Sequence, residues 1–108
     1  MLGSGFIGIE TASHFKLALK DAVDIQVVSQ GNTVYGAVLG ETVGKAMQQI
    51  CEEGGLKFTF GWTASEIVGE NGKVKAVKLD DGTVLDADLV IIGIGIWPDA
   101  SFVKHVIA

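Results

Sequence analysis

Apolar residues in the first part of the chain are spaced as in a helix that is followed by a buried strand. The helical pattern runs from Phe6 to about Lys20. The residues that can share one face of this helix are Ile7, Thr11, His14 or Phe15, and Ala18. Val23–Ser29 is rich in β-branched residues and predicts a parallel strand. Only Met1 and Leu2 stand before the first glycine, so the strand expected ahead of the helix is nearly absent.

A second helix and a further strand are expected next. Gln30–Gly36 is a polar loop, and a helical pattern follows from about Glu41 to Glu53, with Gly54 at its C-terminal cap. The apolar stripe of this helix consists of Val43, Ala46 or Met47, and Ile50 or Cys51. We therefore interpret Cys51 as a small buried hydrophobic residue. Leu56–Phe60 predicts a short third strand.

After Gly61 the pattern changes to that of β-hairpins. Asn71-Gly72 and Asp81-Gly82 separate β-rich runs and are strong signals for tight turns. The strands of the predicted antiparallel meander are Ala64–Val68, Lys73–Leu79 and Thr83–Leu85. Along the middle strand the alternation of polar and apolar residues slips at Ala76-Val77, which allows a bulge.

The last part of the chain contains two more apolar segments. Asp88–Ile92 predicts a parallel strand covered on both faces, and another apolar pattern comprises Phe102, Val103, Val106 and Ile107. The whole order of elements predicts an α/β fold, a Rossmann-like parallel sheet with a truncated first strand and an inserted three-stranded antiparallel β-meander. Because the first strand is short and the last apolar pattern unfinished, we expect the chain to be a fragment of a longer protein.

The composition excludes several classes of protein. The chain has 108 residues, of which 48% are hydrophobic, as expected for one folded domain. Its net charge is −5 and all eight basic residues are lysines, so nucleic-acid binding is not expected. A single cysteine, Cys51, excludes an internal disulfide, a redox pair or a cysteine-rich metal site. His14 has no partner at a metal-ligand spacing, which favours a surface or packed imidazole.

Membrane insertion and secretion are also not expected. The longest apolar run, Leu89–Trp97, is interrupted by glycines and is far shorter than the roughly 20 residues that span a bilayer. No basic segment followed by an apolar core opens the chain, so a secretory signal peptide is not expected. We expect a cytoplasmic protein, with a mitochondrial location as the alternative.

The first ten residues contain the pattern Gly-x-Gly-x-x-Gly, formed by Gly3, Gly5 and Gly8. In a dinucleotide-binding fold the first glycine allows a sharp turn off a strand, and the second lets a pyrophosphate approach the backbone. The third lets the following helix pack closely on the sheet. The N-terminal N–H groups of that helix and its dipole favour a bound anion. The pattern therefore predicts a dinucleotide site.

Ser29 ends the predicted second strand about 20 residues after the third glycine, where an NAD-binding unit usually carries an acid that binds the ribose hydroxyls. A serine can still form such a hydrogen bond, but a neutral bond contributes only about 1 kcal/mol. The arginine expected for the extra phosphate of NADP is also missing. We therefore expect NADH to be preferred over NADPH.

Two stretches carry a resemblance to a known family. They are Gly3–Glu10, at the start, and Asp88–Asp99, which reads Asp-Leu-Val-Ile-Ile-Gly-Ile-Gly-Ile-Trp-Pro-Asp, with the meander between them. In this order they resemble the NAD(H)-binding domain of the pyridine nucleotide–disulfide oxidoreductase superfamily of flavoproteins. The branch most similar is the apoptosis-inducing-factor-like and ferredoxin-reductase-like one, and the resemblance covers essentially the whole chain.

This resemblance implies an FAD-dependent oxidoreductase that passes hydride from NAD(P)H to flavin and on to an electron acceptor, with a ferredoxin or another iron–sulfur protein as the candidate. Residues 1–99 would form the NAD(H)-binding domain, and residues 100–108 would begin the return to an FAD-binding domain. The implied cofactor-binding residues are Gly3, Ser4, Gly5, Phe6, Ile7 and Gly8 at the pyrophosphate, Ser29 at the ribose, and Glu10 and Gly95 toward the nicotinamide.

Other interpretations of these residues stay open. Glu10 can instead be a first-turn acid favoured by the helix dipole, and Trp97 occupies a variable position with a packing or lid role. No catalytic side chain and no metal ligand is expected, because the cofactors carry the chemistry, and the chain alone should not turn over. The alternatives to an oxidoreductase are a free-standing nucleotide-binding or interaction module without catalysis, and a gene fragment that cannot fold alone.

Overall fold

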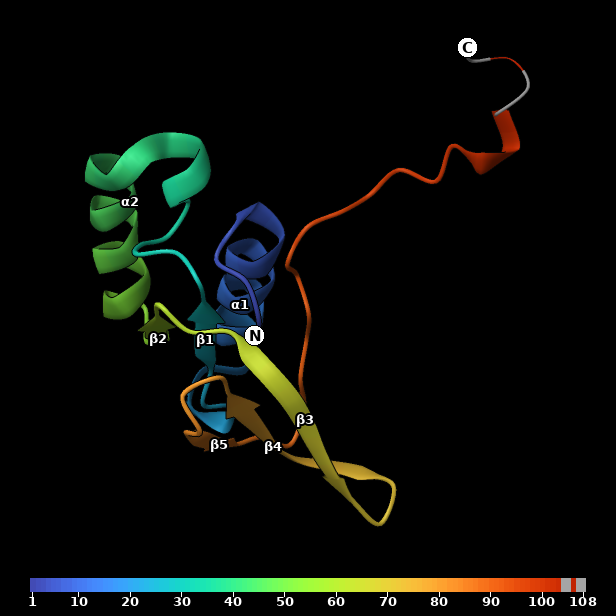
Figure 1. Ribbon diagram of the computed structural model, residues 1–108. Helices are drawn as coiled ribbons and strands as arrows, with labels where there is room; N and C mark the ends of the chain where they lie inside the picture. The colour runs from blue at the N-terminus through green and yellow to red at the C-terminus, as the bar shows by residue number, and fades with distance from the viewer. Residues whose placement is uncertain (104–105, 107–108) are drawn as a thin grey trace.

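Two neighbouring residues of strand β1 (Gln26–Ser29), Val27 and Val28, face different layers of the molecule. Adjacent side chains of a strand point to opposite faces. In the computed structural model, which describes residues 1–103 and 106, Val27 packs among residues of the helices and Val28 among residues of the antiparallel sheet. The layers are therefore two helices, a parallel sheet and an antiparallel sheet (Figure 1).

The elements follow the predicted order. They are α1 (Phe6–Leu19), η1 (Lys20–Ala22), β1, α2 (Gly36–Glu53), β2 (Lys57–Phe60), β3 (Ala64–Glu70), β4 (Lys73–Leu79), β5 (Val84–Asp86) and η2 (Ser101–Val103). Strands β1 and β2 pair in parallel, and β3, β4 and β5 form an antiparallel sheet in that order. The predicted α/β fold with an antiparallel meander is confirmed.

Leu2 lies between β1 and Ile92 and is the one residue that stands at the place of the expected first strand. It forms parallel bridges with Val28 on one side and Ile92 on the other. The Leu2 N–H donates to the Ile91 carbonyl (2.8 Å), and the Gly93 N–H donates to the Leu2 carbonyl (2.8 Å). The truncated first strand is thus confirmed, and the β2–β1 pair continues through Leu2 to Ile92.

The strand expected at Asp88–Ile92 forms only this one bridge. Its neighbour is the segment before Gly3, which has two residues and cannot pair with a longer strand. The prediction that this segment is covered on both faces is wrong. Leu89 is 71% exposed and Ile92 is 55% exposed.

The buried face of α1 differs from the expected one. Gly8, Ile9 and Ala12 are buried, whereas Ile7 and Phe15 are exposed. Contact between Gly8 and the backbone before the helix sets this orientation, since a side chain there would overlap the carbonyl of Gly3. His14 lies on the exposed surface of the helix, as predicted.

Helix α2 begins earlier than expected and bends at Gly40, whose φ of 79° and ψ of 171° are not helical. Gly44 is its buried residue and packs against the loop before the helix, and Met47 and Cys51 contact the core on the same side. Val43 and Ile50 are exposed, so the predicted stripe is only partly right. Cys51 is partly buried against the core, so its interpretation as a buried hydrophobic residue is only partly right, and this burial raises the pKa of its thiol.

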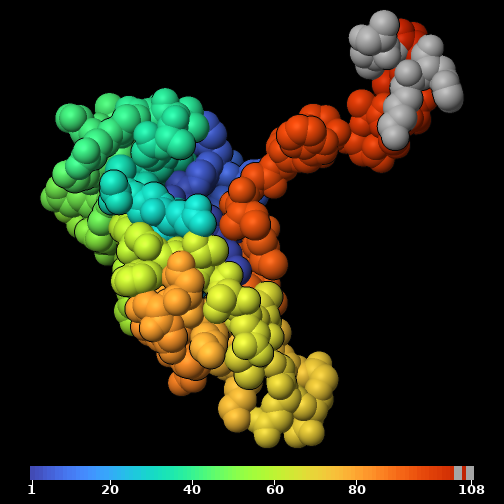
Figure 2. Space-filling model, in the orientation of Figure 1, coloured from blue at the N-terminus to red at the C-terminus, as the bar shows by residue number. Residues whose placement is uncertain are grey.

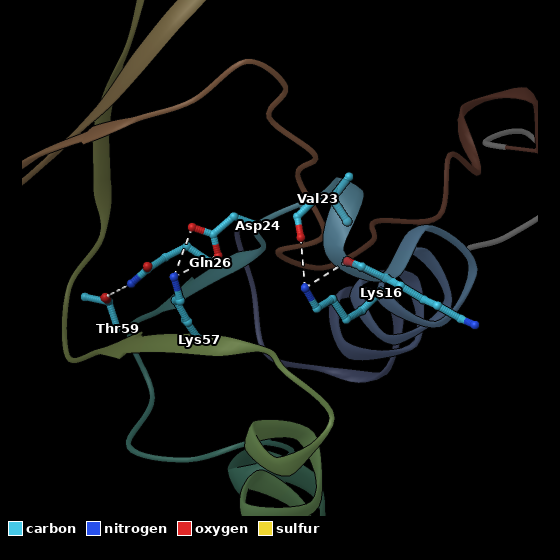
Figure 3. A network of polar contacts seen from close by, with 7 residues as sticks. Lys16, Val23, Asp24, Gln26, Lys57 and Thr59 are labelled. Atoms are coloured by element: carbon cyan, nitrogen blue, oxygen red, sulfur yellow. Dashed lines mark hydrogen bonds and ion pairs between the residues drawn. The ribbon is translucent and has the colours of Figure 1, made fainter.

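A lysine connects the C-terminal end of α1 with the segment that precedes β1 (Figure 3). The Lys16 Nζ donates hydrogen bonds to the carbonyl of Lys20 (3.0 Å) and to that of Val23 (2.8 Å). The last carbonyls of a helix lack intrahelical partners, and a cation there also suits the helix dipole. Lys16 therefore stabilises the turn that leads from the helix into the sheet.

Side chains of β1 and of the segment before it also contact β2 (Figure 3). Lys57 and Asp24 form an ion pair (2.9 Å), and the Gln26 amide donates to the Thr59 hydroxyl. The ion pair is solvent-exposed and contributes little on its own. Both contacts agree with the parallel register, in which Gln26 lies opposite Lys57.

The antiparallel sheet covers the other face of β1, and its β3–β4 ladder has two irregularities. The first lies between Ala64 and Glu66 of β3. The second lies between Val68 and Gly69, where Val68 pairs with Ala76 and Gly69 with Val74, so that Lys75 is the extra residue. Ala76 and Val77 are both buried. The bulge expected at Ala76-Val77 thus lies one residue earlier, and it lets two consecutive apolar side chains contact the core.

The C-terminal segment leaves the body of the molecule (Figure 1). Trp97 is 93% exposed, so its interpretation as a packing residue is wrong. Phe102 is also exposed. Ile107 of the expected apolar pattern, and positions 104, 105, 107 and 108 of the expected return segment, lie outside the described residues. Neither α1 nor α2 has the combined length and apolarity needed to cross a bilayer.

Gly8→Ala should destabilise the fold, because the new Cβ would overlap the Gly3 carbonyl oxygen. The better helix propensity of alanine returns about 1 kcal/mol, but overpacking against backbone exceeds it, and we expect a net loss of about 2 kcal/mol in the free energy of unfolding. Urea denaturation measures this loss. Gly31→Ala is the matched control, since a Cβ there makes only ordinary contacts. Equal stability of the two variants would contradict the packing assigned to Gly8.

Candidate functional site

The chain turns at Gly3 in a conformation that side chains rarely adopt, with φ at +108°. A Cβ on Gly3 would overlap the carbonyl of Gly93, and one on Gly8 would overlap the carbonyl of Gly3. The first and third glycines of the motif are therefore required by packing of backbone against backbone. The mechanical roles expected for these two glycines are confirmed.

Gly5 differs from the other two glycines because the space beside it is open. It precedes α1 with φ at −80° and ψ at −170°, and a Cβ on it would meet no atom of the described chain within 4 Å. None of the described side chains caps this end of the helix. The Ile9 N–H is the one that donates to the Gly5 carbonyl (3.0 Å), so the amides of Phe6, Ile7 and Gly8 come before the helical ladder begins. The free backbone N–H groups and the positive end of the α1 dipole therefore lie next to Gly5, which has no side chain.

A cleft of about 1070 Å³ opens at this point. It lies where the N-terminal residues, the segment after β1 and the segment after Ile92 meet, on the face seen in Figure 2. Its lining comprises residues 2–7, 28–33, 35–38, 41, 62–67 and 92–96. Ligand pockets of proteins usually measure about 300–1000 Å³, so an extended ligand fits here.

Seven of the nine predicted cofactor-binding residues line this cleft, namely Gly3, Ser4, Gly5, Phe6, Ile7, Ser29 and Gly95. Gly8 is buried beneath it. Glu10 is exposed on α1 and is not part of the lining. It also lies beyond the first turn of the helix, which contains no acid, so its interpretation as a first-turn acid is wrong. A nicotinamide-side role for Glu10 stays a prediction.

Ser4 and Ser29 are joined by a hydrogen bond across the cleft floor. The Ser4 Oγ donates to the Ser29 Oγ (2.7 Å), and the Gly31 N–H donates to the same oxygen (3.3 Å). The Ser29 Oγ is thereby held by two hydrogen bonds at the edge of the cleft. Ser4 is buried, and its carbonyl accepts from the Tyr35 N–H (3.0 Å). The glycine loop and the end of β1 thus form one connected floor.

The charge of the cleft lining is negative. Among the described residues that line it, Glu41 and Glu66 are the charged ones, and no lysine, arginine or histidine is present. Lys45 lies outside the lining and pairs with Glu41 (2.5 Å), and its hydrogen bond holds the pKa of the Glu41 carboxyl below the usual value. Glu41 therefore stays ionised at neutral pH. No group of three or more potential metal ligands occurs in the described part of the chain.

Several cleft residues were missed by the sequence analysis, including Tyr35, Glu41, Trp62 and Glu66. Tyr35 stacks at a tilt against Phe6, with ring centroids 4.9 Å apart. Segments that follow neighbouring parallel strands meet at the same edge of a sheet. That rule would have pointed to the residues after Phe60, where Trp62 stands, as well as to those after Ser29.

Comparison with known proteins agrees with this geometry. The family model for pyridine nucleotide-disulphide oxidoreductases matches residues 1–106. Apoptosis-inducing factor 3 of Homo sapiens is 34% identical over 105 residues, which cover 97% of this chain and 17% of that protein.

Two solved structures are also similar. The ferredoxin reductase for the CYP199A2 system from Rhodopseudomonas palustris has a TM-score of 0.88 and 28% identity, over 96% of this chain and 25% of that one. An FAD-dependent pyridine nucleotide-disulphide oxidoreductase from Desulfovibrio vulgaris has a TM-score of 0.79 and 30% identity, over 90% of this chain and 24% of that one. The chain thus spans a quarter or less of the length of these proteins. The predicted resemblance is confirmed, and the chain belongs to the pyridine nucleotide-disulphide oxidoreductase family.

Proposed function

We propose that this chain is the NADH-binding part of an FAD-dependent oxidoreductase. The observation that carries the proposal is the open position beside Gly5, at the N-terminus of α1 and on the wall of the cleft. A pyrophosphate needs backbone donors, positive potential and space without a Cβ, and these three conditions coincide there. The residues present therefore fit a dinucleotide.

In this proposal each part of the cofactor would lie against a different part of the cleft. The amides of Phe6 and Ile7 would hold the pyrophosphate, and the Ser29 hydroxyl would donate to the adenosine ribose. Gly95, with φ at +129° and open space beside it, would let the nicotinamide pass close to the backbone. When bound, NADH supplies a hydride and FAD accepts it. The side chains of this domain bind and orient the cofactor.

In the proposed enzyme, the flavin and the electron acceptor would bind outside this domain. The chain spans a quarter or less of the relatives it matches, so the FAD site of the proposed enzyme would lie outside it. One of these relatives is a ferredoxin reductase. That likeness supports a ferredoxin or another iron–sulfur protein as the acceptor.

The preference for NADH over NADPH rests on the charges of the cleft. A 2′-phosphate beside Ser29 would meet a neutral hydroxyl, and no cation of the described lining would neutralise it. Glu66 lines the same cleft and would repel it, whereas the charge of Glu41 is paired with Lys45. NADPH would therefore bind more weakly than NADH.

Titration with NADH tests the proposal. In the full-length protein that carries this chain, we expect saturable binding below about 1 mM by calorimetry and bleaching of the flavin absorbance when NADH is added without oxygen. Absence of saturable binding up to about 1 mM would contradict the proposal. Binding without flavin reduction would instead support a nucleotide-binding module without catalysis.

Ser29→Glu should tighten NADH binding about fivefold and weaken NADPH binding further. A carboxylate makes a charge-assisted hydrogen bond with the ribose hydroxyls and repels a 2′-phosphate. Ser29→Gln is the matched control, because it has the same length without the charge and should not discriminate in this way. Competition between the two nucleotides in the calorimeter measures both affinities. Tighter binding of NADPH than of NADH by the unmodified protein would show that the role of Ser29 is wrong.

A further inference from the structure

The segment after β2 lies directly beside Ser29. The Gly61 N–H donates to the Ser29 carbonyl (2.9 Å) and to the Gly31 carbonyl (3.2 Å), and the Trp62 N–H donates to the Ser29 carbonyl (3.4 Å). Trp62 therefore stands next to the residue that would hold the adenosine ribose, on the side of β1 that faces β2.

This segment is held from both sides. The Gln30 amide donates to the Thr63 hydroxyl (2.5 Å). On the other side the Thr63 N–H donates to the Asp80 Oδ1 (3.3 Å), and the Asp80 N–H donates to the Thr63 carbonyl (3.0 Å). The backbone on both sides of Trp62 is thus held between the end of β1 and the antiparallel sheet.

The indole of Trp62 lines the cleft and is partly open to it. The residue is 41% exposed and belongs to neither of the two core clusters of the described chain. The aromatic pairs among the described residues are Phe6–Tyr35, His14–Phe15 and Phe58–Phe60, none of which includes Trp62. A large, flat and partly exposed aromatic surface in the lining of the cleft is suited to a planar heterocycle.

The direction of a bound dinucleotide follows from the hydrogen bonds around Ser29. The glycine loop, where the pyrophosphate would lie, contacts Ser29 through Ser4 on one side (2.7 Å). The Gly61–Trp62 segment contacts Ser29 on the other side. A ligand that runs from the glycine loop over Ser29 would therefore reach the segment that carries Trp62 next.

We propose that the indole of Trp62 is the surface on which the adenine base stacks. Trp62 then determines the affinity for the adenosine half of the ligand, and it does so independently of the nicotinamide. This inference rests on the proposed function. Stacking of a base on an aromatic side chain is sensitive to removal of the ring but tolerant of another ring in its place.

Fluorescence of a single tryptophan tests the stacking directly. In residues 1–108 carrying Trp97→Phe, Trp62 is the one remaining tryptophan, and ADP-ribose contains adenine but no reduced nicotinamide that could accept energy. We expect ADP-ribose to quench the emission of Trp62 saturably. In the matched variant Trp62→Phe, the emission of Trp97 should not change, because Trp97 is 93% exposed and outside the cleft lining.

Affinities provide the second measurement. Trp62→Ala should weaken both NADH and ADP-ribose about tenfold by calorimetry, whereas Trp62→Phe should keep most of the affinity and Trp97→Ala all of it. Circular dichroism checks whether each variant is folded. If Trp62→Ala does not fold, the quenching of Trp62 by ADP-ribose in the Trp97→Phe variant tests the stacking instead.

The outcomes separate this inference from the proposed function. If the unmodified protein binds NADH but ADP-ribose leaves the emission of Trp62 unchanged, the stacking is overturned and the NADH-binding function stands. Equal affinities of Trp62→Ala and the unmodified protein would overturn it likewise. If the unmodified protein does not bind NADH, the proposed function itself fails, and this inference fails with it.

Discussion

Three backbone segments meet without side chains between them, and the rest of the molecule depends on this contact. Gly3 lies against the carbonyl of Gly93, and Gly8 lies against the carbonyl of Gly3. The first turn of α1 is therefore held directly on the edge of the parallel sheet where Leu2 bridges Val28 and Ile92. A single Cβ at either glycine would push the helix away from the sheet. Because well-packed interiors have few voids, such a displacement would reach the neighbouring elements.

The same contact locates the cleft. Parallel strands end at one edge of the sheet, and the helix that begins at this edge directs its N-terminal amides outward. The segments after β1, after β2 and after Ile92 therefore border one cleft, although they lie far apart in the sequence. Gly5 is the one glycine of the motif that lines open space, so the packing and binding roles of the motif are divided among different residues.

The elements with a local signal were predictable from the sequence. Helical spacing identified α1 and most of α2, and the Asn71-Gly72 and Asp81-Gly82 turns identified the meander. The helix faces were not predictable in the same way. Gly8 and Gly44 decide which side is buried through close backbone contact, and a count of apolar side chains does not detect that. The strand expected at Asp88–Ile92 depended on a partner that only Leu2 supplies.

Some residues of the candidate site could be predicted from the sequence and others could not. The glycine motif and Ser29 could be found because their spacing is a property of consecutive residues. Glu41, Trp62 and Glu66 border the cleft through the pairing of β1 with β2 and through the bend at Gly40, so their place depends on the tertiary structure. The negative charge of the lining and the aromatic surface beside Ser29 emerge only when these segments are brought together.

The most direct test of this account is NADH binding by the variant Gly5→Val, measured by calorimetry together with its stability in urea. The backbone at Gly5 has angles that valine can adopt, and the space beside it is open, so the free energy of unfolding should change by less than about 1 kcal/mol. The new side chain would occupy the place of the pyrophosphate, and we expect NADH affinity to fall by at least about 100-fold, because several hydrogen bonds to a charged group are lost together. A folded Gly5→Val protein that binds NADH as tightly as the unmodified one would contradict the account.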